Sequence, residues 1–182
     1  MDIPTHYWGF EVGRKYLCPS HLYAFVASLP GFKSDGVGDL GVAITFDNSV
    51  FTKPARDARS RVWTAYDGNL RVLDLQRYRV SRRLRSELAS FIEGDGSSYA
   101  VVDQSGGESL VYAFRAFGQD WWITFRLSPI EGLEGVKMAV TSLECGRPEP
   151  SKRMPKKLSH FAVDCVRREC EVLSSFMDRP AS

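Results

Sequence analysis

Cysteine and histidine are scarce in this chain, and it has no long hydrophobic run. None of its cysteines forms a Cys-x-x-Cys pair, and no histidine stands at metal-ligand spacing, so the sequence predicts no metal site. The apolar runs are far shorter than the roughly 20 residues that a membrane-spanning helix requires. We therefore expect no membrane insertion. The scarce residues are Cys18, Cys145, Cys165, Cys170, His6, His21 and His160.

The N-terminus also lacks the basic stretch and apolar core of an export signal. Without export, the cysteines are expected to be reduced thiols in the core of a cytoplasmic protein. The composition, 43% hydrophobic and 25% charged, is typical of a globular protein and excludes a disordered or coiled-coil class. We expect one domain over residues 1–182.

Apolar spacing in the first half of the chain predicts both helices and strands. Leu22, Phe25, Val26 and Leu29 fit one helical face, which Pro30-Gly31 ends, and a strand follows at 42–46. A hairpin is predicted from 61–66 and 70–75, joined by Asp67-Gly68-Asn69. A second helix is predicted over 82–93, with Ser81 as its N-cap and Gly94 as its end.

The second half of the chain reads as a sheet followed by a helix. Strands at 99–103, 110–117 and 121–127 predict an antiparallel meander, with a fourth strand at 136–143. Trp121 and Trp122 alternate, so Trp121 is expected in the core. An exposed, basic, proline-rich linker is expected at 146–157, then a docked helix at about 158–177. The fold class predicted is α+β: a mainly antiparallel sheet with two or three packed helices, in a single compact domain.

Positive charge is segregated along the chain, although the formal net charge is only +2. Residues 52–87 hold ten Lys/Arg against four Asp/Glu, and residues 146–168 hold seven against two. Guanidinium groups make bidentate contacts with phosphate. Five arginines fall within 77–85, and those on the second helix avoid its apolar stripe. The cluster therefore indicates either a nucleic-acid-binding surface or a solvated face; its members are Arg77, Arg79, Arg82, Arg83 and Arg85.

Two other groups extend this predicted nucleic-acid-binding site. Trp122 shares a strand face with Arg126, which favours an exposed aromatic beside a cation, as in single-strand binders, although a second packed layer would also bury the ring. The basic linker contributes Lys152, Arg153, Lys156 and Lys157. No catalytic residue and no cofactor is assigned. Gly36-Val37-Gly38-Asp39-Leu40-Gly41 matches a dinucleotide-binding pattern, but it leads into a strand rather than a helix and reads as a turn.

Residues 70–117 resemble the early part of the ParB/sulfiredoxin superfamily. The resemblance rests on a strand at Leu73–Leu75, an arginine-bearing loop at Arg77–Arg79, the helix Leu84–Ile92, Gly94 and a strand at Ala100–Val102. The later Gly-x-x-Arg box of that family has no match here. The resemblance implies nucleic-acid or nucleotide recognition, since the superfamily includes partition proteins, nucleases and plasmid-borne fertility-inhibition factors with nuclease and ATPase activity.

Three functional hypotheses follow. The first is a small accessory or regulatory protein of a plasmid or other mobile element that binds DNA or RNA through its arginine-rich surface. The second is a small nuclease or phosphohydrolase, in which arginines stabilise phosphate charge and Glu87 or a histidine acts as acid or base. The third is an inhibitor or immunity-type protein that binds a protein partner.

Overall fold

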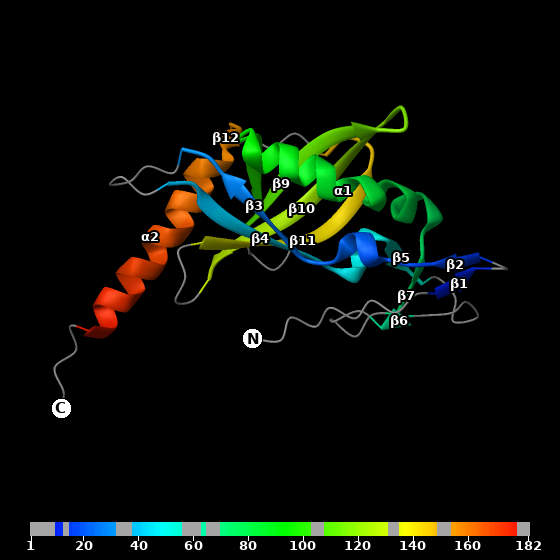
Figure 1. The fold of residues 1–182 in the computed structure, drawn as a ribbon, viewed down its shortest axis with the longest axis horizontal. Helices are drawn as coiled ribbons and strands as arrows, with labels where there is room; N and C mark the ends of the chain where they lie inside the picture. Colours follow the sequence, from blue (N-terminus) through cyan, green and yellow to red (C-terminus); the bar gives the residue numbers. More distant parts are fainter. Residues whose placement is uncertain are drawn as a thin grey trace.

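The computed structural model describes residues 10–12, 15–31, 38–55, 63–64, 70–102, 108–130, 135–148 and 154–177. The main element of this structure is a seven-stranded sheet with the order β12-β8-β9-β10-β11-β4-β3 (Figure 1). Its strands are β3 (Phe25–Leu29), β4 (Leu40–Phe46), β8 (Ser97–Val102), β9 (Glu108–Ala116), β10 (Gln119–Pro129), β11 (Gly135–Cys145) and β12 (Lys156–Lys157). Two α-helices in the described part are α1 (Leu75–Glu93) and α2 (Leu158–Met177). The α+β class is therefore confirmed.

The sheet is mixed rather than purely antiparallel. Strands β8, β9, β10 and β11 form the predicted antiparallel meander. Strand β4 then pairs with β11 in parallel, from Gly135 opposite Gly41 to Val140 opposite Phe46. Every other pair of neighbours in this sheet is antiparallel. The sequence pattern predicted β4 and the strands β8 to β11, but not β3 or β12, and it did not indicate which distant strands become neighbours.

Smaller elements flank this sheet. The predicted hairpin is present as β6 (Trp63–Thr64) paired with β7 (Leu70–Leu73), and β5 (Thr52–Pro54) pairs with the other side of β7. The turn predicted at 67–69 lies outside the described residues. Two short strands, β1 (Phe10–Val12) and β2 (Lys15–Leu17), form a separate ladder. The 3-10 turns are η1 (Ser20–Leu22) and η2 (Asn48–Val50).

The first predicted helix is wrong. Only η1 is helical there, and the chain continues into the edge strand β3. Ala27 and Leu29 are buried while Val26 is 72% exposed, which is the alternation of a half-buried strand. Apolar residues at 22, 25, 26 and 29 also fit a helical face. The segment is nevertheless a strand, because it pairs with β4, where Phe25 lies opposite Ile44. The glycine-rich segment that ends at Gly41 consequently follows a strand and not a helix.

Helix α1 begins earlier than predicted. Its N-cap is Asp74, whose carboxylate accepts hydrogen bonds from the backbone N–H groups of Gln76 (2.9 Å) and Arg77 (3.0 Å). Ser81, the predicted cap, is buried inside the helix. The predicted end at Gly94 is confirmed. The first two arginines of the cluster, Arg77 and Arg79, are therefore on the helix and not on a loop.

The core lies between α1 and one face of the sheet. Helix α1 buries Val80, Leu84, Leu88, Phe91 and Ile92. The ring of Phe91 stacks on Tyr112 with centroids 4.1 Å apart and meets Phe125 edge-on at 6.1 Å. Trp121 is 1% exposed on the same sheet face, whereas Trp122 is only half-buried. The alternation predicted for β10 is thus confirmed.

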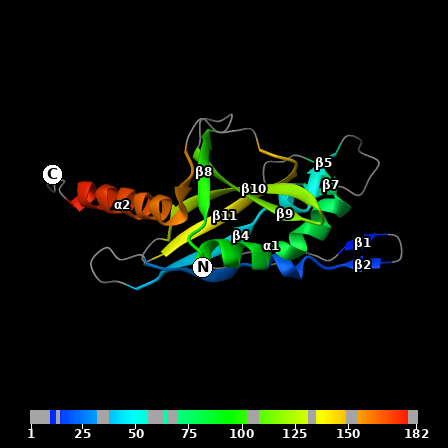
Figure 2. The same cartoon turned by 90° about the horizontal axis from the view of Figure 1, so that it is seen from above.

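Helix α2 starts beside the end of α1. Asp95, with φ of 44°, accepts hydrogen bonds from the backbone N–H of Ser159 (2.8 Å) and from its hydroxyl (2.9 Å). The N–H of Leu158 donates to the carbonyl of Gly96 (3.0 Å). A Cβ at Gly96 would lie 2.2 Å from the Phe91 ring, so only glycine allows this close approach. Leu158 and Ala162 are buried against the core, and the helix then extends past the sheet (Figure 2).

Other expectations are corrected in part. The end of the proline-rich linker forms β12, where Lys156 and Lys157 pair with β8 at the sheet edge. Cys18 and Cys145 are exposed thiols rather than core residues, and Cys165 is half-buried. Within the described ranges, neither helix is long and apolar enough to cross a membrane.

Candidate nucleic-acid interface

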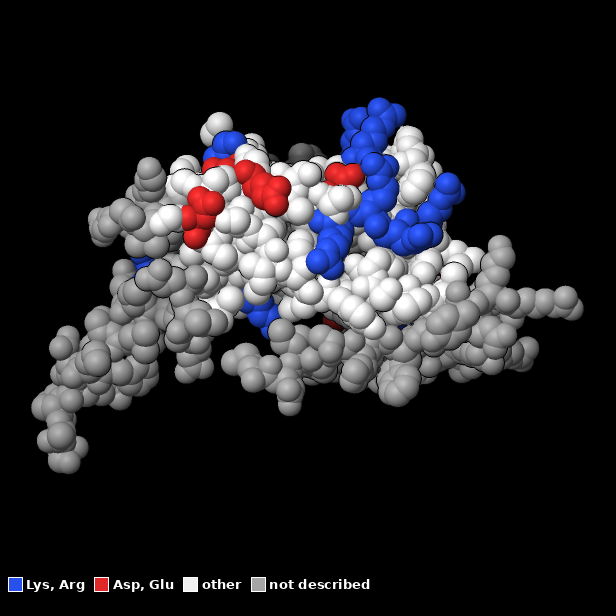
Figure 3. All heavy atoms as spheres, in the orientation of Figure 1, with Lys and Arg blue, Asp and Glu red and all other residues white. Residues whose placement is uncertain are grey.

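Four arginines project from the outer side of α1. Buried positions at 80, 81, 84 and 88 mark the inner face of the helix, and the helical period turns the positions between them outward. The side chains of Arg79, Arg82, Arg83 and Arg85 are accordingly exposed. Figure 3 shows Lys and Arg atoms gathered at the upper right, over α1 and the β9–β10 hairpin, while most of the visible acidic atoms lie further left.

The turn between β9 and β10 reaches this side of the helix. It consists of Phe117 and Gly118, with φ of 51° and 77°. The guanidinium carbon of Arg79 lies 4.3 Å from the Phe117 ring centroid, and that of Arg83 lies 5.7 Å away. Arg115 donates to the carbonyl of Gly118 (3.4 Å). We call the group Arg79, Arg82, Arg83, Arg115 and Phe117 the arginine surface.

Carboxylates neutralise little of this surface. Arg83 has an ion pair with Glu87 at 3.4 Å, but the two side chains are 48% and 24% exposed, so water and salt screen the pair. The Asp74 carboxylate caps the helix and lies 3.5 Å from the ammonium of Lys53. Across the residues that the structure describes, no carboxylate forms an ion pair with the guanidinium of Arg79, Arg82 or Arg115. The surface keeps a local excess of positive charge.

Arg77 lies apart from the arginine surface. Its side chain is only 15% exposed and points towards η2 and the end of β11. The guanidinium donates to the carbonyls of Ser49 (3.1 Å) and Thr52 (2.8 Å) and to the carboxylate of Glu144 (2.6 Å). Because the guanidinium N–H groups of Arg77 donate to these partners inside the protein, the side chain anchors α1 to the sheet. Arg85 lies on the other flank of the helix, 4.7 Å from the Phe25 ring centroid.

The remaining predicted residues are dispersed. Trp122 and Arg126 lie on the sheet face opposite to the one that α1 covers, where Arg126 donates to the Ser109 hydroxyl (3.3 Å). Lys156 and Lys157 occupy the edge strand β12. Lys152 and Arg153 fall outside the described residues. The structure therefore brings together Arg79, Arg82 and Arg83, and it separates them from the tryptophan and lysine groups.

Comparison of the sequence with known protein families identifies the family of the chain. The model of the YjaZ family matches residues 9–165, a range that includes α1, the β9–β10 hairpin and the whole seven-stranded sheet. The chain belongs to the YjaZ family. The resemblance to the ParB/sulfiredoxin superfamily is thereby wrong: its strand, helix and glycine pattern is short enough to recur in an unrelated fold. Searches of curated proteins and of solved structures gave no match.

Sequence reasoning did not place Arg115 and Phe117 beside the arginines of α1 in this YjaZ-family protein. Arg115 and Phe117 stand at the end of a predicted strand, where the period-two pattern assigns them only to a sheet face. The sequence signal that could have indicated their role was an aromatic residue directly before Gly118 in a tight hairpin. Its meaning depends on the hairpin bending towards α1, which is a tertiary contact.

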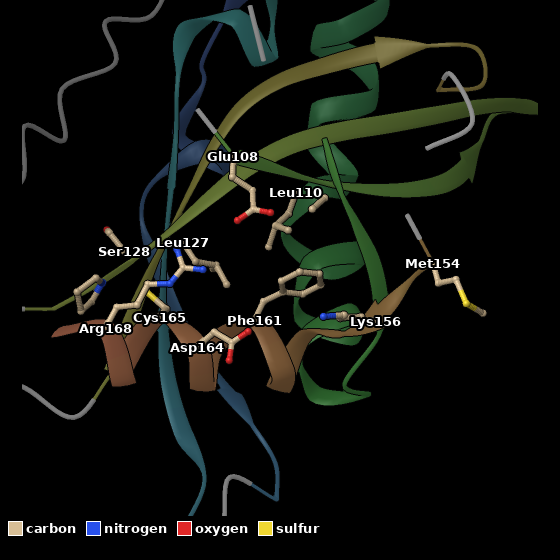
Figure 4. Close-up of a pocket in the computed structure, with 12 residues that line it drawn as sticks. Glu108, Leu110, Leu127, Ser128, Met154, Lys156, Phe161, Asp164, Cys165 and Arg168 are labelled. Atoms are coloured by element: carbon tan, nitrogen blue, oxygen red, sulfur yellow. The ribbon is translucent and has the colours of Figure 1, made fainter. Parts of the chain in front are cut away.

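A groove lies between α2 and the sheet of this YjaZ-family protein, with a volume of about 660 Å³ (Figure 4). Leu110, Leu127 and Phe161 give it apolar walls. Its charged lining residues carry both signs: Glu108, Asp164, Lys156 and Arg168. Such a mixture favours no ligand of one charge. Over the described ranges, no three His, Cys, Asp or Glu side chains are grouped so that they could hold a metal ion.

His21 packs against α1 at Tyr78 and Ser81. Its Nε2 is 2.8 Å from the Ser81 hydroxyl, and its ring meets Tyr78 edge-on with centroids 5.3 Å apart. Burial lowers the pKa of His21, and the nearby Arg82 charge acts in the same direction, against a hydrogen bond with the backbone of Cys18. Folding therefore shifts the imidazole towards its neutral form relative to the unfolded chain.

This pKa shift predicts a pH dependence of stability. The unfolded chain binds a proton at His21 near pH 6.5, where the folded protein binds less. Stability from this group is therefore present above that pH and is lost as the pH falls towards the lower folded pKa. Wild type should therefore lose more stability than His21→Gln when the pH falls from 7 to 5. The difference between their free energies of unfolding should shrink over this range by less than about 1 kcal/mol, because the ring is half-exposed. Urea titrations at both pH values measure it, and a difference independent of pH contradicts the assignment.

Proposed function

We propose that this YjaZ-family protein binds nucleic acid through the arginine surface. The observation that carries the proposal is the set of guanidinium groups on one side of α1, joined by Arg115 from the β9–β10 hairpin. Guanidinium groups stay charged at every working pH and match phosphate oxygens in a bidentate geometry. A nucleic-acid backbone presents such phosphates in a row.

Solubility alone is a poor explanation for this arrangement. Arg79 and Arg83 are one helical turn apart, and Arg79 and Arg82 are three residues apart, so like charges face each other along the helix. Such pairs destabilise a helix by a few tenths of a kcal/mol each, about 0.2–0.5. A solubilising face of mixed sign avoids that cost. A cluster of positive charges is instead favourable when an anionic ligand binds, because the phosphates of the ligand relieve the repulsion between the guanidinium groups.

The proposal predicts a large loss of binding when these charges are removed. In the triple variant Arg79→Gln, Arg82→Gln, Arg83→Gln, affinity for a fluorescent oligonucleotide should fall more than about tenfold at 0.1 M salt. The slope of log affinity against log salt should fall by about two to three, since each lost phosphate contact removes about 0.7–0.9. Fluorescence anisotropy over a salt series measures both quantities.

A matched control removes the same charge elsewhere. Lys137, Arg167 and Arg168 are exposed and distant in sequence from α1, and their replacement by glutamine leaves the arginine surface intact. This control variant should bind like wild type with an unchanged salt slope. Equal losses in both triple variants would mean that only net charge matters. No binding by wild type at low salt would end the proposal.

A further inference from the structure

Phe117 occupies a backbone conformation that suits other residues better. The two-residue turn has positive φ at both positions, 51° at Phe117 and 77° at Gly118, as in a type I′ hairpin. Asn, Asp and Gly are preferred at both positions, because a bulky side chain is strained at positive φ. Gly118 fits this preference, and Phe117 does not. Turn formation does not account for a phenylalanine here.

Packing does not account for it either. The Phe117 side chain remains 49% exposed at the tip of the hairpin, while most large apolar side chains of the sheet are buried. Burial in the core is the usual gain from a large apolar side chain, and this ring forgoes about half of it. Strained backbone and exposed apolar surface at one residue point to a role outside folding.

The surroundings of the ring indicate what that role is. The guanidinium of Arg79 lies 4.3 Å from the ring centroid and that of Arg83 lies 5.7 Å away, so cations hold the ring from the protein side. Arg115 contacts the same turn. An exposed aromatic ring set among arginines resembles the sites at which proteins stack unpaired bases while cations hold the phosphates on either side.

We infer that the ligand of the arginine surface is single-stranded nucleic acid and that an unpaired base stacks on the exposed part of the Phe117 ring. This inference rests on the nucleic-acid binding proposed above. A duplex also presents phosphates to the arginines. Its bases, however, are stacked on one another, so their faces are not available to an aromatic side chain. Phe117 therefore discriminates for single strands, and the arginines supply affinity for either form.

The experiment compares three probes of equal length: oligothymidylate, an abasic oligomer with the same phosphates, and a DNA duplex. Phe117→Asn removes the ring and places at this turn a residue that tolerates positive φ, so its unfolding temperature should match or exceed that of wild type. We expect this variant to bind oligothymidylate about tenfold more weakly. Its affinity for the abasic oligomer and for the duplex should stay within about twofold of wild type, because base–aromatic stacking is the only contact with the nucleic acid that the substitution removes.

Phe117→Trp provides the second variant, because indole offers a larger stacking surface. It should bind oligothymidylate at least as tightly as wild type. Wild type should also bind oligothymidylate more tightly than the abasic oligomer. A polyglutamate peptide serves as a further probe, which tests whether an acidic protein segment binds in the same way.

The outcomes separate this inference from the function on which it rests. If the Arg79, Arg82 and Arg83 variant loses binding while Phe117→Asn keeps full affinity for oligothymidylate, the nucleic-acid function stands and the stacking role is wrong. Equal loss by Phe117→Asn on all three nucleic acids also overturns it, as does polyglutamate binding that depends on Phe117 to the same degree. If wild type binds none of the nucleic acids, both fail.

Discussion

Replacing Trp121 by alanine is expected to lower the free energy of unfolding by about 3–5 kcal/mol. The side chain is 1% exposed and is among the largest fully buried ones in the described core. It lies on β10 opposite Phe114 of β9, on the sheet face that α1 covers. Truncation removes this buried apolar surface and leaves a cavity that neighbouring strands fill poorly. Urea unfolding followed by circular dichroism measures the change.

The neighbouring tryptophan is the control for this prediction. Trp122 lies on the other face of the same strand and is only half-buried, so Trp122→Ala should cost about 1 kcal/mol. Trp121→Phe gives a third comparison. Within the described residues the buried indole N–H of Trp121 has no hydrogen-bond partner, so phenylalanine loses volume there but no bond. Equal costs for the two alanine variants would contradict the assignment of the two faces.

Replacing Arg77 by methionine is expected to cost about 3 kcal/mol, because a largely buried guanidinium loses three partners at once. Methionine keeps the length of the stem, so the cost reflects polar contacts. The carbonyl of Thr52 retains its bond from Arg71 (3.2 Å), whereas the Glu144 carboxylate loses the guanidinium 2.6 Å from it. Thermal and urea unfolding at pH 7 measure the effect.

Arg82→Met is the matched control for Arg77→Met. It makes the same substitution on the same helix at an exposed position, and its effect on unfolding should stay within about 0.5 kcal/mol. Binding should show the reverse order, with Arg82→Met weakening nucleic-acid affinity more than Arg77→Met. A large stability loss in both variants would show that helix propensity, and not the buried bonds, governs the result.

The sequence predicted those elements whose signal is local. The meander from 97 to 145 followed from period-two alternation and short turns, and the end of α1 followed from Gly94. The start of α1 was missed because 70–75 read as a β-rich run, although Asp74 is a good N-cap. Strand β3 was missed because its apolar spacing fits a helix equally well. Its true state depends on pairing with β4, which no local pattern contains.

The candidate site shows the same division. The helical period was sufficient to predict that Arg82, Arg83 and Arg85 are exposed. Because α1 begins earlier than predicted, Arg79 also lies on its exposed side. The inward turn of Arg77 depends on carbonyls from η2 and on Glu144, which is distant in sequence. The place of Phe117 depends on positive φ at the turn and on the bend of the hairpin towards α1. Such contacts appear only when the chain is folded.

The parallel contact between β4 and β11 also sets an order of events during synthesis. Gly41 pairs beside Gly135, so β4 leaves the ribosome long before its partner exists. At about 5–20 residues per second, that wait lasts roughly 5–20 seconds. During it, the apolar side of β3 and β4, with Leu29, Val42 and Ile44, has no sheet to join. The nascent chain is then most exposed to aggregation, and its final assembly requires the closing of a long loop.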